Sequence, residues 1–277
     1  MNFSSPDRDP GFFETIVAQI GRVVLGKESQ VRLALTCLFA DGHLLIEDLP
    51  GIGKTTLAKV LSRCLGLQFR RVQFTSDMLP GDVLGVSVFE RKSSSFVFHP
   101  GPIFTQVLLA DEINRATPKT QSALLEAMEE RQVTVEGETR SLEIPFFVIA
   151  TQNPAEQSGT FPLPESQLDR FLMRIELGYP ARSAERQLLR SDGSRAALQE
   201  FSASLDGADV QHIQRKAAGV QVSDAVLEYV QDLLEFTRTS NHFYVGLSPR
   251  AGLNLLAAAR AWAYLHGRDF VLPEDLQ

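Results

Sequence analysis

The sequence predicts an α/β fold, with helices on both faces of a parallel sheet, followed by a smaller all-helical domain. Three short apolar runs, at residues 43–46, 107–110 and 146–150, have the length and composition of strands buried on both faces. Helical patterns separate these runs, and such alternation is typical of a parallel sheet. After Tyr179 and Pro180 the apolar spacing is helical throughout, which indicates a second domain.

The helices around these runs follow from the spacing of apolar residues. Residues 12–40 contain two apolar stripes at helical spacing, with a break at 23–27. A further apolar face over residues 55–65 predicts a helix after the first strand. After the second strand, Thr117 is placed as an N-cap and Pro118 as a first helical residue.

Two stretches inside this pattern alternate between apolar and polar residues. Residues 84–99 alternate around a polar tip at 91–95, and residues 132–144 alternate around a turn at Gly137. Such alternation over a short length with a turn at its centre predicts a β-hairpin. We therefore expect two hairpins inserted into the α/β core.

The chain divides into three parts by composition. We expect a flexible arm at residues 1–11, an α/β core at 12–180 and a helical domain at 181–277. Residues 191–209 are polar and rich in small side chains, which favours a loop. The last residues resemble a helix start, so we expect the helical domain to be shortened at its C-terminus. Two of its helices are predicted to follow the N-caps Ser223 and Ser248.

The composition narrows the function. A net charge of −7 argues against a broad surface for nucleic acid. The sequence has no run of 18 uncharged apolar residues, so we expect no membrane span. Residues 1–11 lack the layout of a secretory signal, and we expect a cytoplasmic protein. Cys37 and Cys64 lie in apolar helical patterns and are expected as buried thiols rather than as a redox pair or metal ligands.

A glycine-rich loop follows the first predicted strand and precedes a helix. Gly51, Gly53, Lys54 and Thr55 nearly match the loop that binds phosphate through backbone N–H groups. Lys54 would neutralise phosphate oxygens, and Thr55 would offer its hydroxyl to Mg²⁺. Asp48 stands where that pattern has its first glycine, and a plain glycine-rich turn is the alternative. The predicted phosphate-binding residues are Pro50, Gly51, Ile52, Gly53, Lys54, Thr55 and Thr56.

Acidic and amide side chains follow the other two predicted strands. Asp111 suits Mg²⁺, and the adjacent Glu112 suits a general base acting on a water molecule. The alternative is an acidic helix N-terminus, which favours carboxylates in any case. Asn153 could orient the attacking water, or could belong to a turn before Pro154. Open α/β sheets bind ligands at this edge, so the set predicts hydrolysis of a bound nucleotide.

The motifs, taken in order, resemble the MoxR branch of the AAA+ ATPases. The resemblance runs from about residue 12 to the C-terminus, and the ordered set is far more specific than the loop alone. It implies a P-loop αβα sandwich with inserted β-hairpins, the AAA+ core, and a helical lid. The matching segments are IEDLPGIGKT at 46–55, LADEINRA at 109–116, ATQNP at 150–154, LPESQLDRF at 163–171 and LSPR at 247–250.

The resemblance assigns further roles to named positions. Asn153 corresponds to the polar sensor at the end of a core strand. Arg170 corresponds to the arginine finger offered to a neighbouring subunit's ATP, with Arg174 as the second choice. Arg250 corresponds to the second sensor, which reaches the γ-phosphate from the lid. Without the resemblance, Arg170 is more simply a salt-bridge partner and Arg250 a solvated side chain. The adenine is expected against Val24, Leu25 and Gly26.

The resemblance implies an ATP-driven and Mg²⁺-dependent motor that remodels other proteins in a chaperone-like way. It further implies a homo-oligomeric ring of six subunits that acts on protein clients, with a partner protein that carries a von Willebrand factor A domain. One alternative is a nucleic-acid motor, such as a helicase or its loader, which the acidic charge disfavours. The other is a nucleotide-gated scaffold without hydrolysis. Glu112, Asn153 and Arg170 disfavour this scaffold, since it has no need of them.

Overall fold

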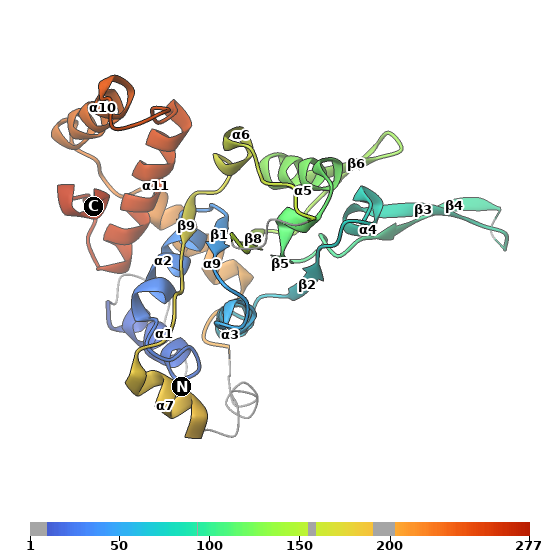
Figure 1. Ribbon diagram of the computed structural model, residues 1–277, viewed down its shortest axis with the longest axis horizontal. Coiled ribbons are helices and arrows are strands. Elements are labelled where there is room, and N and C mark those ends of the chain that lie inside the picture. The colour runs from blue at the N-terminus through green and yellow to red at the C-terminus, as the bar shows by residue number, and fades with distance from the viewer. Residues whose placement is uncertain (1–9, 93, 155–158, 191–202) are drawn as a thin grey trace.

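A parallel sheet organises the protein. The computed structural model describes residues 10–92, 94–154, 159–190 and 203–277. These residues form a five-stranded sheet in the order β2-β5-β8-β1-β9 (Figure 1). All of its strand pairs are parallel, so the carboxyl ends of the strands meet at one edge. The strands are β1 (Leu44–Glu47), β2 (Phe69–Gln73), β5 (Val107–Asp111), β8 (Phe147–Gln152) and β9 (Met173–Ile175).

Three of these strands are the apolar runs of the sequence. β1, β5 and β8 lie within one or two residues of their predicted bounds. The sequence pattern does not predict β2 or β9. β2 lies at an edge of the sheet and exposes Arg70, Arg71 and Gln73, so it lacks the continuous apolar pattern of a central strand. β9 has only three residues, which is too short for a periodic signal.

Helices cover both faces of the sheet. Leu109 of β5 faces a hydrophobic cluster that holds residues from α1, α2 and α3, including Leu57. Leu108, its neighbour in the chain, faces a second cluster with Leu124 of α5. Adjacent residues of a strand point to opposite faces, so these clusters form the two layers of an αβα sandwich. The helices are α1 (Pro10–Gly21), α2 (Glu28–Phe39), α3 (Lys54–Cys64) and α5 (Pro118–Glu130).

The predicted helix caps are confirmed. The Thr117 hydroxyl accepts a hydrogen bond from the backbone N–H of Thr120, and Pro118 occupies the first position of α5. Ser223 and Ser248 cap the two C-terminal helices α10 (Asp224–Thr239) and α11 (Pro249–Leu265) in the same way. Each hydroxyl satisfies a backbone donor that the helix itself leaves without a partner.

Both predicted hairpins are present. β3 (Gly85–Glu90) pairs with β4 (Ser95–Pro100), and β6 (Gln132–Val135) pairs with β7 (Glu138–Ser141). A short helix, α4 (Pro80–Leu84), leads into the first hairpin, which projects away from the sheet (Figure 1).

The C-terminal part is helical, as expected. It contains α7 (Arg182–Arg190), α9 (Gly207–Ala218), α10, α11 and a 3₁₀ helix, η2 (Pro273–Leu276). Most of the loop predicted at 191–209 lies outside the described residues, but α9 already begins at Gly207 because the Asp206 carboxylate caps it. α9 and α11 pack against α2. Within the described part of the chain, no helix is both long and apolar enough to cross a membrane.

Candidate functional site

The glycine-rich loop joins β1 to α3 at the carboxyl edge of the sheet. Gly51 and Gly53 have φ angles of 84° and 102°, a region that favours glycine. A Cβ atom added to either residue would meet no described atom within 4 Å, so it would point into open space. Among the described residues no side chain caps the first turn of α3, which leaves its backbone N–H groups available to an anion.

Lys54 begins α3 and is nearly buried. Its side chain turns back along the loop, and the ammonium donates a hydrogen bond to the carbonyl oxygen of Asp48 at 2.6 Å. Burial lowers the pKa of Lys54, while the carboxylates of Asp111, Asp48 and Glu112 oppose this shift. The ammonium group therefore lies where negative charge would relieve the cost of its burial.

Asp48 is the residue that departs from the general loop pattern. One of its carboxylate oxygens accepts from the backbone N–H of Leu49 at 2.8 Å, and the other accepts from the N–H of Gly178 at 2.5 Å. The carboxylate thus fastens the loop to the segment that follows β9. Asp48 is not among the described residues that line the cavity beside the loop. Its carboxylate is therefore not one of the groups that a phosphate in this cavity would contact.

Asp111 ends β5 and is buried. Its Oδ1 accepts a hydrogen bond from the Thr151 hydroxyl at 2.6 Å, and its Oδ2 accepts from Arg71. The Thr151 hydroxyl also accepts from the backbone N–H of Glu112 at 2.9 Å. This side chain therefore joins the ends of β5 and β8 and places Asp111 and Glu112 beside Asn153.

Glu112 lies directly after β5 with a φ angle of 58°, a left-handed conformation that is uncommon for a residue with a side chain. Its carboxylate forms an ion pair with Arg115 at 3.1 Å, across the 3₁₀ helix η1 (Ile113–Arg115). Both side chains are partly exposed, so this pair contributes little to stability. The carboxylate can exchange it for another partner at small cost.

These residues surround one cavity of about 320 Å³. The predicted residues Lys54, Thr55, Asp111, Glu112 and Asn153 all line it. The predicted Ile52 instead packs against the hydrophobic cluster. Arg71 is not among the predicted site residues, and it lines the cavity because β2 pairs with β5. Since the sequence does not predict β2, it has no signal for this arginine. The full lining is Pro50, Gly51, Gly53, Lys54, Thr55, Thr56, Arg71, Asp111, Glu112 and Asn153.

Comparisons with known proteins agree with this geometry. Residues 43–173 match the profile of the ATPase family associated with various cellular activities (AAA), and residues 235–277 match that of the AAA lid domain. The chain is 38% identical to Chaperone MoxR1 of Mycobacterium tuberculosis over 95% of its own length and 72% of that protein. It is 34% identical to Protein MoxR of Paracoccus denitrificans, over 96% of this chain and 85% of that protein. The chain belongs to the MoxR family of AAA+ ATPases.

Two further comparisons extend this result. This MoxR-family ATPase is 46% identical to the uncharacterized protein YeaC of Bacillus subtilis, over 94% of its own chain and 82% of that protein. A solved structure from Cytophaga hutchinsonii, described as a candidate ATPase, matches with a TM-score of 0.86 and 36% identity. That match covers 96% of this chain and 84% of the other. The protein is therefore an ATP hydrolase with the AAA+ fold, as the sequence predicts.

Arg170 and Arg250 lie together, away from the phosphate loop. Arg170, just after α6 (Glu165–Leu168), donates to the Leu125 carbonyl and pairs with Glu129, both at 2.9 Å. Arg250, in the first turn of α11, pairs with the same Glu129 at 3.1 Å. The two arginines border a separate cavity of about 200 Å³ beside His43, which precedes β1, whereas the phosphate loop follows β1. They therefore lie at the end of the sheet where the strands begin, opposite the carboxyl ends that carry the phosphate loop. Neither arginine is among the described residues lining the phosphate cavity of its own chain.

Arg174, the other candidate for the arginine finger, lies elsewhere. It is on β9, and its guanidinium pairs with the buried Glu47 at the end of β1. Glu47 also accepts a hydrogen bond from Gln152 at the end of β8. Burial raises the pKa of Glu47, and Arg174 opposes that shift. The structure thus gives Arg170 and Arg174 different partners at different edges of the sheet.

The segment predicted to contact adenine packs against the start of α7. Val24 is buried, and a Cβ atom on Gly26 would lie 3.1 Å from the Cβ of Ala184. Nearby, Lys27 donates to the carbonyl of Tyr179 at 2.8 Å. Since Gly178 binds Asp48, these segments are connected to the phosphate loop. Val24, Leu25 and Gly26 do not line the phosphate cavity in the described part of the chain, so any role with adenine stays a prediction.

His43 is buried as the neutral imidazole. Its Nδ1 accepts from the backbone N–H of Val148 at 3.1 Å, which leaves Nε2 to donate to the Met128 carbonyl at 3.2 Å. Burial, assisted by the charge of Arg131, lowers the pKa of His43 from 6.5 to about 4. Protonation would place an unpaired charge in the core and remove the acceptor at Nδ1.

We expect His43 to make the fold sensitive to mild acid. The folded-state pKa is depressed, so its contribution is fully present above pH 6.5 and is lost as the pH falls towards 4. The free energy of unfolding should fall by up to about 1.4 kcal/mol per pH unit in this window. Urea unfolding of the wild type, His43→Gln and the exposed-site control His99→Gln, at several pH values, measures it. Equal slopes in all three proteins would refute this role.

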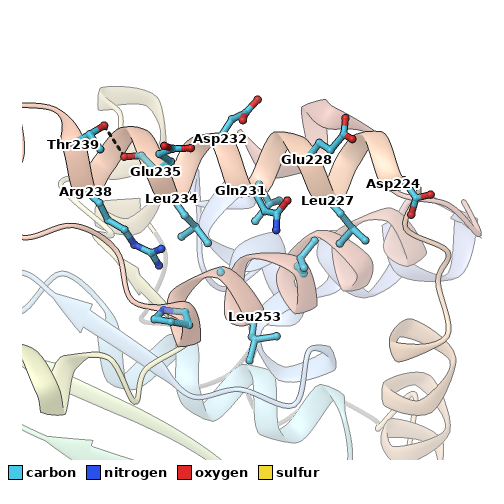
Figure 2. A pocket seen from close by; sticks show the side chains of 14 residues that line it. Asp224, Leu227, Glu228, Gln231, Asp232, Leu234, Glu235, Arg238, Thr239 and Leu253 are labelled. Atoms are coloured by element: carbon cyan, nitrogen blue, oxygen red, sulfur yellow. Dashed lines mark hydrogen bonds between the residues drawn. The ribbon is translucent and has the colours of Figure 1, made fainter.

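A second groove lies between α10 and α11, far along the chain from the loop. It has a volume of about 1110 Å³ and shares no described lining residue with the phosphate cavity. Figure 2 shows Leu227 and Leu234 on the side of α10 that faces α11, with Glu228 and Asp232 on the opposite side. None of the residues predicted to bind nucleotide lines this groove in the described structure.

Proposed function

We propose that this MoxR-family ATPase is a chaperone-like motor that remodels other proteins as a homo-oligomeric ring of six subunits. The observation that carries the proposal is the position of Arg170 and Arg250, at the opposite edge of the sheet from the phosphate loop of their own chain. A neighbouring subunit is the simplest recipient for both guanidinium groups. A relative named Chaperone MoxR1 supports the chaperone-like part.

In this proposal the phosphate chain of ATP lies along the loop at 50–56. The N–H groups at the start of α3 and the ammonium of Lys54 contact its oxygens. The hydroxyl of Thr55 and the carboxylate of Asp111 would hold Mg²⁺, because both residues line the same cavity and Mg²⁺ prefers oxygen ligands. When bound, the ion would neutralise charge on the phosphate oxygens.

Glu112 is the proposed general base. Its carboxylate borders the cavity and would take a proton from the attacking water after exchanging its pairing with Arg115. The amide of Asn153, at the end of β8, would hold that water in line with the terminal phosphate. Arg170 of the neighbouring subunit would then stabilise the charge that develops in the transition state, with Arg250 acting beside it.

The rest of the chain would convert hydrolysis into movement. We propose a core at 12–180 and a lid at 181–277, with the adenine between residues 24–26 and the lid. Movement of the lid against the core would shift the hairpins. The β3–β4 hairpin exposes Phe89 and Phe96, which offer apolar contact to a protein client. A von Willebrand factor A domain protein as partner, and the cytoplasm as location, complete the proposal.

The dependence of the rate on protein concentration tests the ring. If the arginine comes from a neighbour, the ATPase rate per subunit should rise steeply with concentration and level off when assembly is complete. Light scattering on the same samples should show assembly over the same range. A protein that is monomeric by light scattering and already hydrolyses ATP at the full rate per subunit would contradict the proposal.

The choice of substrate needs a separate experiment. An unfolded protein should raise the ATPase rate of the assembled enzyme, and duplex DNA should not, at low or high salt. The net charge of −7 is the reason to expect no DNA effect. Strong stimulation by DNA that disappears at high salt would instead favour a nucleic-acid motor. Nucleotide binding without turnover in the assembled state would favour the scaffold.

A further inference from the structure

Arg71 lines the phosphate cavity beside the proposed catalytic groups. It lies on the edge strand β2, two residues before the position that pairs with Asp111. Its Nε and Nη2 donate to the same oxygen of Asp111, at 3.0 and 2.6 Å, and Nη2 also donates to Gln73 at 2.8 Å. Among the described residues, Nη1 has no hydrogen-bond partner. The Arg71 side chain is 44% exposed and lines the same cavity as Lys54 and Thr55.

The two oxygens of Asp111 are both engaged. Thr151 donates to Oδ1 and Arg71 donates to Oδ2. A divalent cation held by Thr55 and Asp111 would compete with Arg71 for Oδ2, because two cations at one carboxylate oxygen repel each other. Arg71 would therefore have to release Asp111 when the cation arrives. The cavity that it borders is the space in which an anionic phosphate would be found.

We propose that Arg71 binds the terminal phosphate of ATP. Asp111 holds the Arg71 guanidinium before nucleotide binds, and releases it to the phosphate when Mg²⁺ binds the Asp111 carboxylate. The proposal rests on the phosphate and metal assignments made above. A guanidinium suits this exchange because its planar donors match carboxylate and phosphate oxygens alike. The carboxylate of Asp111 thus serves two cations in turn, and each phosphate site gains one arginine from its own chain.

The test compares a triphosphate with a diphosphate. The affinities of ADP and of a non-hydrolysable ATP analogue are measured by fluorescence anisotropy, with Mg²⁺ present, for wild type, Arg71→Gln and Arg71→Lys. A lost charge-assisted contact should weaken the triphosphate about tenfold in Arg71→Gln. ADP lacks the terminal phosphate, so its affinity should stay nearly unchanged. Arg71→Lys keeps the charge without the planar donors and should give a smaller loss of the same kind.

The adjacent Arg70 offers a matched control. It is an exposed cation on the same strand whose side chain points to the other face, so Arg70→Gln should leave both affinities unchanged. An equal loss of ADP and triphosphate affinity in both Arg71 variants would mean that Arg71 only ties β2 to Asp111, and would overturn the proposal. Unchanged affinities would overturn it too. Failure of the wild type to bind either nucleotide would instead overturn the phosphate site itself.

Discussion

Replacing Arg170 by alanine is expected to lower the ATPase rate of the assembled protein by roughly 10³-fold or more, because an arginine supplied in trans contributes on that scale. ATP affinity should change little. Arg170 pairs with Glu129 and Leu125 of its own chain and is not among the described residues of its own phosphate cavity. A steady-state rate, measured together with the affinity of an ATP analogue, separates the loss of turnover from a loss of binding.

Mixing variants makes the test specific for transfer between subunits. Arg170→Ala keeps a complete phosphate loop, while Lys54→Ala keeps Arg170 but loses the loop's ammonium. Each variant alone should be nearly inactive. A mixture should regain a substantial rate, because Lys54→Ala subunits supply Arg170 to the intact loops of their neighbours.

Arg174→Ala is the matched control in this experiment. Arg174 pairs with Glu47 at the end of β1 and thus belongs to the loop's edge of the sheet. Mixing Arg174→Ala with Lys54→Ala should give no higher ATPase rate per Arg174→Ala subunit than Arg174→Ala gives alone. If instead that mixture recovers and the Arg170 mixture does not, Arg174 is the finger.

Glu112→Gln should carry the second large effect. The amide is close in size to the carboxylate but cannot accept the proton of the attacking water, so the rate should fall by about 10² to 10⁴-fold. The ATP analogue should bind as in the wild type, since the ion pair with Arg115 is exposed and adds little to the fold. Single-turnover hydrolysis of labelled ATP measures the chemical step directly.

A neighbouring acid provides the comparison for Glu112. Glu126 is exposed on α5, and Glu126→Gln removes the same charge without reaching the cavity. Its rate should match that of the wild type. Turnover that persists in Glu112→Gln would remove this carboxylate from the role of base and direct attention to the other groups of the cavity.

Much of this fold can be predicted from short stretches of sequence. β1, β5 and β8 are central strands, so both of their faces are buried and their apolar composition is continuous. Thr117, Ser223 and Ser248 cap helices through hydrogen bonds to residues three positions later, which is a local relation. β2 escapes prediction because an edge strand with Arg70 and Arg71 carries no such pattern.

The candidate site divides in the same way. Lys54, Thr55, Asp111, Glu112 and Asn153 follow the ends of predicted strands, and parallel pairing brings those ends together. Arg71 precedes the end of its strand by two residues and reaches the cavity only because β2 pairs with β5. The direction of the Asp48 carboxylate depends on Gly178, which is 130 residues away in the chain.

The sequence by itself determined the phosphate loop, the acidic residues at a strand end and the family, because each depends on spacing within a few residues. Only the tertiary structure decided which side chains share a site. In the folded protein the Asp48 carboxylate accepts a hydrogen bond from Gly178, and Arg71 forms an ion pair with Asp111. Arg170 and Arg250 both pair with Glu129, at the end of the sheet opposite the phosphate loop. The physical reason is that these contacts join residues far apart in the sequence. They depend on strand order and helix packing, which no single stretch of the chain determines.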